Sequence, residues 1–173
     1  CGLPLMPSGW SGRNNFDEKQ APLRGAICLG DVLRAAGYET AFVGGADPSF
    51  AGKQYFLHDH GFNQIYGRED IHRESGKAWP DDWWGAEDHD MLAYATDVLD
   101  DLERDGKPLY LSLLTLDTHG PTGRASSHCK GDSNGAELPA IYTCSLDAVE
   151  RFLSELERRG RLNDTVVVLM GVV

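Results

Sequence analysis

Residues 108–116 limit most strongly how this chain can fold. Their side chains are almost all apolar and rich in leucine, which is typical of a strand covered on both faces of a parallel sheet. Asp117, Thr118 and His119 follow at once, and Gly120 and Pro121 then end the strand. In open α/β sheets, ligands bind beyond the carboxyl ends of the strands. We therefore expect a binding site here, although a single histidine after a strand could equally cap a turn.

Helical and strand patterns alternate along the rest of the chain. This alternation predicts an α/β domain with a mostly parallel sheet and helices on both faces, formed as one domain by residues 1–173. Further strands are expected at 40–43 and 166–170, the latter buried. Helices are expected at about 29–36, 53–60 and 87–104 and before Gly160, whereas residues 63–85 and 120–138 read as irregular.

The composition narrows the class of protein. A chain of 173 residues, 41% hydrophobic and 25% charged, can bury a sizeable core. Its net charge of −11, with no basic cluster, argues against nucleic acid as a partner. The longest apolar runs fall far short of the roughly 20 residues that span a bilayer, and we see no signal peptide. Because the chain opens on Cys1, we expect a piece of a longer protein.

The four cysteines leave two interpretations open. Cys1, Cys28, Cys129 and Cys144 contain no Cys-x-x-Cys spacing, and the nearest histidines form no zinc pattern, which argues against a structural zinc site. The cysteines fit two disulfides in an oxidising compartment or four thiols in the cytosol. For a domain of this size, composition alone slightly favours the thiols.

Two other segments could contribute to a site. Gly44 and Gly45 end the first strand, and Lys53 begins a helix, where its ammonium group could meet an anionic oxygen. The pattern alone favours a tight turn followed by a solvated lysine, and the P-loop order of residues is absent. Trp84 precedes an acidic helix start and could wall a pocket, while Asp88 there has the better claim to a structural role. The histidines outside the 117–121 segment read as solvated (His58, His60, His72 and His89) or as lacking an identifiable partner (His128).

These motifs together resemble a known family. The segment 118–121 is similar to the Thr/Asn-His-x-Pro segment of the sulfatase-like branch of the alkaline phosphatase superfamily. Residues 42–53 and the Trp84-Gly85 pair resemble, more narrowly, the phosphoglycerol transferases that modify periplasmic glucans, which are related to the lipoteichoic acid synthases. Matching blocks follow one another in the family's order over nearly the whole chain, at 1–5, 28–33, 50–53, 60–62, 66–67, 84–85, 116–119 and 164–168.

The resemblance implies an alkaline phosphatase/sulfatase-like fold, present as a partial domain, and an enzyme. That enzyme would move glycerophosphate from a phosphatidylglycerol-derived donor to a periplasmic glucan or polyol, at the periplasmic face of the bacterial inner membrane. A divalent metal, manganese or magnesium, is expected in the full-length enzyme, and membrane attachment only through segments outside this chain. The alternatives are a sulfatase or phosphodiesterase of the same fold and a non-catalytic anion-binding module. The sulfatase signature Cys-x-Pro-x-Arg is not matched at Cys1.

The resemblance also assigns roles to residues. His119 would be catalytic, bonding a phosphate oxygen or the leaving group, and Lys53 would neutralise charge. Further substrate-binding positions would be Gly45, Asp47, Phe50, Trp84 and Asp117.

Two departures from the family bear on activity. The family's threonine nucleophile and one acidic metal ligand match positions before Cys1, and its Asp-His metal ligands match Val172 and Val173, which cannot ligate a hard cation. We therefore expect no catalytic metal and no turnover in this chain. The family's periplasmic location favours disulfides, with Cys129–Cys144 as the first pair and Cys1–Cys28 as a less certain second.

Overall fold

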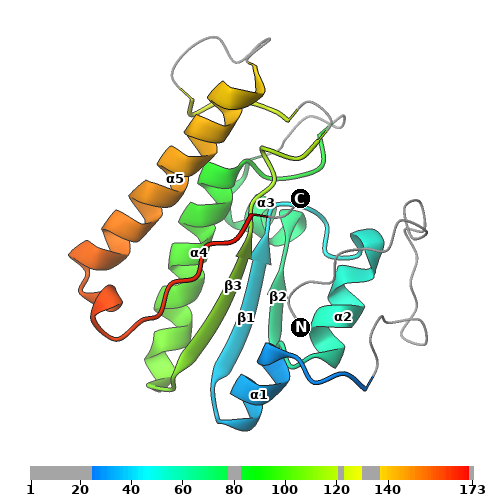
Figure 1. Ribbon diagram of the computed structural model, residues 1–173, viewed down its shortest axis with the longest axis vertical. Helices are drawn as coiled ribbons and strands as arrows, with labels where there is room; N and C mark the ends of the chain where they lie inside the picture. The colour runs from blue at the N-terminus through cyan, green and yellow to red at the C-terminus, as the bar shows by residue number, and fades with distance from the viewer. Residues whose placement is uncertain (1–24, 78–82, 121–122, 130–136, 172–173) are drawn as a thin grey trace.

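The computed structural model describes residues 25–77, 83–120, 123–129 and 137–171, and within them a parallel sheet (Figure 1). Strand β1 (Glu39–Gly44) lies between β2 (Gln64–Tyr66) and β3 (Leu109–Leu114), and both neighbours run parallel to it. The predicted strands at 40–43 and 108–116 are thereby confirmed. Within the described part of the chain β3 pairs only with β1, so its side chains are half-buried rather than covered on both faces.

Helices cover both faces of this sheet, as predicted. Alternate side chains of β1 point to opposite faces, so Ala41 and Val43 enter one core and Phe42 enters the other. The first core is covered by α3 (Arg68–Ser75), α4 (Asp88–Leu102) and α5 (Leu138–Arg158). The second is covered by α1 (Leu29–Ala35) and α2 (Lys53–Asp59). Short 3-10 helices lie at Phe50–Gly52, Glu103–Asp105 and Arg161–Asn163.

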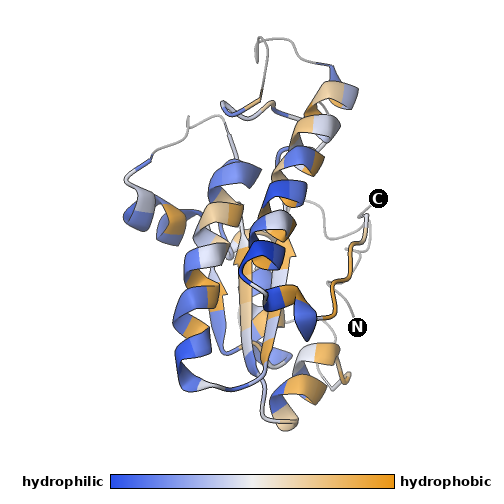
Figure 2. Cartoon of the chain, turned by 90° about the vertical axis from the view of Figure 1, so that its left-hand side faces the viewer, coloured by the Kyte–Doolittle hydropathy of each residue, from blue (hydrophilic) through white to orange (hydrophobic). Residues whose placement is uncertain are grey.

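Helix α4 follows its predicted pattern closely. All six apolar side chains of the predicted stripe are buried, namely Met91, Leu92, Ala95, Val98, Leu99 and Leu102. All of them except Leu99 belong to the core that α4 shares with the sheet and α5. Acidic residues in its first turn suit the positive end of the helix dipole. Figure 2 shows the resulting division, with hydrophilic residues on the outer faces of the helices and apolar residues towards the sheet. None of the described helices has the length and apolar content needed to cross a membrane.

The prediction that residues 63–85 are irregular is wrong. This segment contains both β2 and α3. Helix α3 buries only one large apolar side chain, Ile71, and therefore shows no apolar periodicity in the sequence. Its ends are fixed locally instead. The backbone N–H of Gly67 donates to Asp70 Oδ2 at 3.0 Å, and Gly76 ends the helix in the left-handed conformation.

Residues 166–170 do not form the expected buried strand. They are extended and exposed, with 89% of Val166 and 77% of Met170 accessible, and they form the apolar stretch near the C-terminal end in Figure 2. An apolar, β-branched run favours a strand, but a strand also needs a neighbour to complete its hydrogen bonds. No described segment pairs with these residues.

Candidate functional site

The candidate site lies where β1 and β3 end, and two glycines bring its segments together. The backbone N–H of Ala86 donates to the carbonyl of Gly45 at 2.8 Å, and Ala46 forms an antiparallel bridge with Gly85. A Cβ on Gly85 would lie 1.9 Å from the Gly45 oxygen, and one on Gly45 would lie 2.7 Å from the Ala86 oxygen. Close backbone packing therefore explains both glycines. The substrate-binding role expected of Gly45 stays a prediction.

Four of the predicted side chains form a continuous row across this end of the sheet. The rings of His119 and Trp84 have centroids 4.0 Å apart, and those of Trp84 and Phe50 lie 5.5 Å apart. Lys53 Nζ lies 5.2 Å from the centre of the Phe50 ring. Phe50 is 39% and Trp84 42% exposed, so a ligand can reach this Lys53–His119 row from solvent.

A strained turn sets the position of Lys53. Ala51 and Gly52 both adopt left-handed backbone angles, with φ of 58° and 73°, and Ala51 is the residue for which this conformation is costly. Lys53 Nζ donates to the carbonyls of Asp47 and Phe50, each at 3.2 Å. Burial lowers the pKa of Lys53, and the neighbouring Asp47 opposes that shift. An ammonium group has three N–H donors, so these two bonds leave one for an anionic oxygen.

Asp47 takes part in the same turn. Its Oδ1 accepts the backbone N–H of Ser49 at 2.8 Å, and its carbonyl accepts the backbone N–H of Phe50 at 3.1 Å. The side chain therefore shapes the loop that presents Lys53. Contact between Asp47 and a substrate stays a prediction.

One ring nitrogen of His119 is held by a hydrogen bond within its own loop. Its Nδ1 lies 2.7 Å from the carbonyl oxygen of Gly120, and because a carbonyl only accepts, Nδ1 must hold the hydrogen. In the neutral ring Nε2 is then an acceptor, and in the protonated ring it is a donor. The backbone N–H of His119 donates to Leu116 O at 2.8 Å, which fixes the turn after β3.

A pair of buried carboxyl groups holds the base of the His119 loop. Asp88 Oδ1 accepts the backbone N–H groups of Leu116 and Asp117, at 2.5 and 3.1 Å, and Asp88 Oδ2 accepts Ser145 Oγ at 2.6 Å. In return, the backbone N–H of Asp88 donates to Asp117 Oδ2 at 3.2 Å. The structural role expected of Asp88 is confirmed by these bonds, which join α4, α5 and the end of β3.

Asp117 belongs to this support and not to the surface of the site. It is 2% exposed, and its Oδ1 is buried with no hydrogen-bond partner among the described residues. Burial, followed by the nearby charge of Asp88, raises the pKa of Asp117 to about 8. The hydrogen bonds between Asp117 and Asp88 give Asp117 a part in holding the loop that carries His119. Direct contact between Asp117 and a substrate stays a prediction.

The segment beyond His119 is fastened by Glu87 and by a disulfide. Glu87 accepts hydrogen bonds from Ser126 Oγ and from the backbone N–H and Oγ of Ser127, between 2.7 and 3.0 Å. Cys129 and Cys144 form the predicted disulfide, with their Cα atoms 5.6 Å apart, and so tie the loop to α5. For the second predicted pair, Cys28 is a free, buried thiol and Cys1 lies outside the described residues.

Two histidines were misjudged from the sequence. His60, expected to be solvated, is only 2% exposed, and its Nδ1 lies 3.2 Å from Asp31 Oδ2. His128, for which the sequence suggested no partner, lies 3.3 Å from both Lys77 Nζ and Asp90 Oδ1. These partners come from distant parts of the chain, and no local pattern signals them.

Comparisons with known proteins agree with this architecture. The sulfatase family model matches residues 2–171. A relative named phosphoglycerol transferase I from Xanthomonas axonopodis pv. citri (strain 306) is 37% identical over 98% of this chain and 25% of its own length. Another relative of that name, from Salmonella arizonae, is 36% identical over 98% of this chain and 22% of its own length. The chain thus spans about a quarter of the length of these curated relatives.

Two solved structures share the fold. A protein in the alkaline phosphatase superfamily from Vibrio parahaemolyticus has a TM-score of 0.58 and 22% identity, over 84% of this chain and 34% of its own. The lipoteichoic acid synthase LtaP from Listeria monocytogenes has a TM-score of 0.63 and 18% identity, over 86% of this chain and 37% of its own. Because the family model spans nearly the whole sequence, this chain belongs to the sulfatase family.

Proposed function

We propose that this chain is the phosphate-recognising part of a phosphoglycerol transferase. The complete enzyme would take glycerophosphate from a phosphatidylglycerol-derived donor and pass it to a glucan or polyol at the periplasmic face of the inner membrane. The observation that supports this most is the solvent-accessible row that runs from Lys53 to His119. The names of the relatives, phosphoglycerol transferase I, support the class of reaction.

Each residue of the row has a distinct task in this proposal. Lys53 offers its remaining N–H donor and its charge to a phosphate oxygen. His119 Nε2 bonds a second oxygen, as donor when the ring is protonated and as acceptor when the phosphate oxygen is protonated. The exposed rings of Phe50 and Trp84 pack against the glycerol carbons. Phosphoryl transfer depends on such positioning and charge neutralisation.

Sulfatase-family enzymes generally use a divalent metal, which would supply Lewis-acid activation and charge neutralisation. The buried carboxyl groups behind the His119 loop do not fit such an ion. Both oxygens of Asp88 already accept hydrogen bonds, and burial raises the pKa of Asp117, which disfavours the ionised form that would ligate an ion. Val172 and Val173 have aliphatic side chains without donor atoms. We propose accordingly that this chain alone turns over no phosphodiester.

The valines also favour a second candidate, a non-catalytic anion-binding module. In that case the row would bind a phosphate or sulfate ester without any chemical step. A hydrolase of the same fold is the remaining alternative. Incubation of the protein with a chromogenic phosphodiester and manganese or magnesium separates the hydrolase from the other two candidates, because the transferase fragment and the binding module both leave the diester intact. Hydrolysis that is lost in His119→Ala would favour the hydrolase and contradict our proposal.

Calorimetric titration with glycerol 1-phosphate tests recognition of the phosphate directly. We expect Lys53→Ala and His119→Ala each to weaken binding by about 10- to 150-fold, since a charge-assisted hydrogen bond contributes about 1.5–3 kcal/mol. Matched controls are Lys107→Ala and His58→Ala, whose side chains are 52% and 82% exposed and lie outside the row. Binding that is equally strong in the row variants and the controls would refute the proposal.

A further inference from the structure

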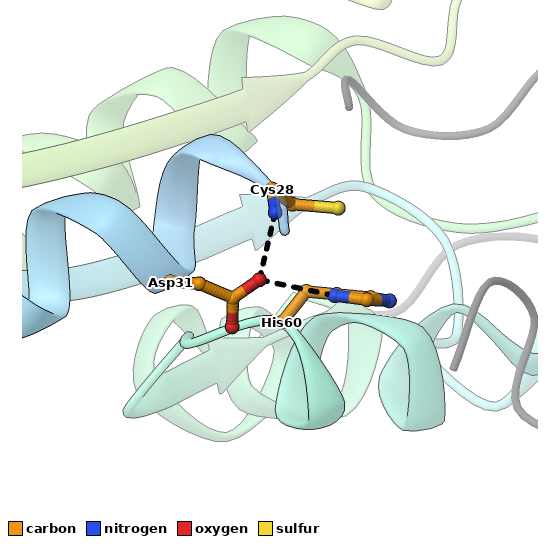
Figure 3. Close-up of side chains that lie close together, drawn as sticks. All are labelled: Cys28, Asp31 and His60. Atoms are coloured by element: carbon orange, nitrogen blue, oxygen red, sulfur yellow. Dashed lines mark hydrogen bonds and ion pairs between the residues drawn. The ribbon is translucent and has the colours of Figure 1, made fainter. Parts of the chain in front are cut away.

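A second cluster of side chains lies at the opposite end of α2 from Lys53. Cys28, Asp31 and His60 meet there, as Figure 3 shows. The backbone N–H of Cys28 donates to Asp31 Oδ2 at 2.8 Å, and His60 Nδ1 lies 3.2 Å from the same oxygen. The thiol, one carboxylate oxygen and one imidazole nitrogen all lie within 4.8 Å of one another. We call these three residues the Cys-Asp-His cluster.

The fold holds the three residues rigidly in place. Cys28 is the N-cap of α1, and Asp31, three residues later, turns back towards it in a capping box. His60 is the C-cap of α2. Two glycines press these segments together, because a Cβ on Gly30 would lie 2.3 Å from the carbonyl oxygen of His60 and one on Gly61 would lie 2.5 Å from the Gly30 carbonyl carbon.

Burial distinguishes this cluster from an ordinary polar surface. Cys28 is 3% and His60 is 2% exposed, whereas the side chain of Asp31 is 29% exposed and opens the cluster to solvent. Burial raises the pKa of the Cys28 thiol. A buried thiol and imidazole beside a carboxylate are a set of donors that a divalent ion of borderline softness prefers.

We propose that the Cys-Asp-His cluster binds a zinc-type divalent ion, separate from the Lys53–His119 row. Tetrahedral zinc with its usual bond lengths separates a nitrogen and an oxygen ligand by about 3.4 Å, which is close to the 3.2 Å observed between His60 Nδ1 and Asp31 Oδ2. A sulfur ligand would lie about 3.6 Å from each, so Cys28 Sγ, which lies within 4.8 Å of a ligand atom of each residue, would move closer when the ion binds. Solvent at the Asp31 side supplies the fourth ligand.

The protons and charges of the three ligands can be accounted for when the ion binds. The Cys28 thiol loses its proton to solvent and binds as thiolate, and His60 binds through a nitrogen that has no hydrogen. The ion is thus held by one thiolate, one carboxylate and one neutral imidazole. No oxidant or reductant is needed. The same thiol cannot bind the ion and form the predicted disulfide with Cys1, so the two states exclude each other.

The site would influence the Lys53–His119 row through α2. Lys53 begins this helix of seven residues and His60 follows its end, so the helix spans about 10 Å between the two sites. An ion at the far end would fix α2 to α1 and thereby hold Lys53 in register with Phe50 and Trp84. The ion acts on structure and has no part in the transfer reaction.

Cobalt substitution tests this site without any activity assay. The protein, reduced and freed of metal by a chelator, is titrated with Co²⁺ and then with Zn²⁺. We expect one ion per chain and a near-ultraviolet thiolate-to-cobalt absorption band. In Cys28→Ser this band should vanish, and in both Cys28→Ser and His60→Asn the affinity should fall about 100-fold or more.

His58→Asn is the matched control, because His58 lies two residues from His60 and its side chain is 82% exposed. His128→Asn tests the other group of three possible ligands, Glu87, Asp90 and His128. Both variants should keep the band and the affinity. Circular dichroism identifies any variant that fails to fold. If Cys28→Ser or His60→Asn does not fold, Asp31→Asn replaces it, and its affinity for cobalt should also fall. The proposal is wrong if the reduced protein shows no thiolate band, if Cys28→Ser binds cobalt unchanged, or if the exported protein contains a Cys1–Cys28 disulfide.

Discussion

The two loops of the Lys53–His119 row are held in opposite ways. The loop after β3 depends on side chains. Asp88 and Glu87 accept its hydrogen bonds, its own Asp117 accepts the backbone N–H of Asp88, and a disulfide ties it to α5. The loop after β1 depends mainly on its own backbone, through two left-handed residues and close glycine contacts. His119 is therefore sensitive to distant side chains, and Lys53 to backbone conformation nearby.

Among substitutions that test how the two loops are held, Asp88→Ala should have the largest effect on stability. It removes the acceptor for the Leu116 and Asp117 N–H groups and leaves both buried. We expect the free energy of unfolding to fall by about 3 kcal/mol or more, because each buried unsatisfied group costs about 1–3 kcal/mol. Urea unfolding measures this. Asp101→Ala, in the same helix with its side chain 68% exposed, should change the free energy little. Equal effects of the two substitutions would show that side chains do not hold the His119 loop.

Removal of the disulfide should have the next largest effect. Cys129 and Cys144 are separated by 15 positions, and closing a loop of this length contributes about 3 kcal/mol. The double variant Cys129→Ser/Cys144→Ser should lose about this amount of stability in thermal unfolding. Reducing agent should lower the midpoint of the unmodified protein towards that of the double variant and leave the variant unchanged. An unchanged midpoint in the unmodified protein would mean that the bond does not hold the loop.

Gly85→Ala tests the backbone packing under the loop after β1. The new Cβ would lie 1.9 Å from the Gly45 oxygen, and relieving the clash should cost about 1–3 kcal/mol. The same change at Gly120, where a Cβ meets nothing within 4 Å, is the control and should be nearly neutral. Chemical denaturation compares the two. The contact is less rigid than described if Gly85→Ala is as stable as Gly120→Ala.

The pKa of Asp117 should also make the stability of the protein depend on pH. The pKa of Asp117 is raised to about 8 by burial and by Asp88, while an unfolded aspartate titrates near 4. The folded state therefore holds this proton more tightly, and the resulting stability is present at acidic pH and is lost as pH rises through about 8. The thermal midpoint should fall from about pH 5 to pH 9, and less steeply in Asp117→Asn than in Asp101→Asn. Identical slopes would show that Asp117 titrates normally.

The sequence predicted those helices and strands whose own residues show a clear apolar pattern. Helix α4 has a regular apolar stripe, and β1 and β3 are dense apolar runs, so each was located correctly. Helix α3 was missed because polar residues form it through local caps. Residues 166–170 have the composition of a strand, but composition cannot show whether a pairing partner is present.

The same division applies to the candidate site. The resemblance to a family singled out Lys53, Phe50, Trp84 and His119, and the structure joins them in one row. It also suggested substrate contact for Asp117, whose burial depends on residues about thirty positions away. The burial of His60 depends likewise on the distant Asp31. Such long-range packing leaves no periodic signal in the sequence.

Binding of a phosphate ester along the row is the central claim. The most direct measurement is an NMR titration with glycerol 1-phosphate that follows the imidazole nitrogens of His119, the indole N–H of Trp84 and the ammonium of Lys53 together. We predict that all three signals shift with a single dissociation constant, while the signals of His58 and Lys107 stay in place. Shifts confined to one of the three residues, or equal shifts at the two control residues, would contradict the claim.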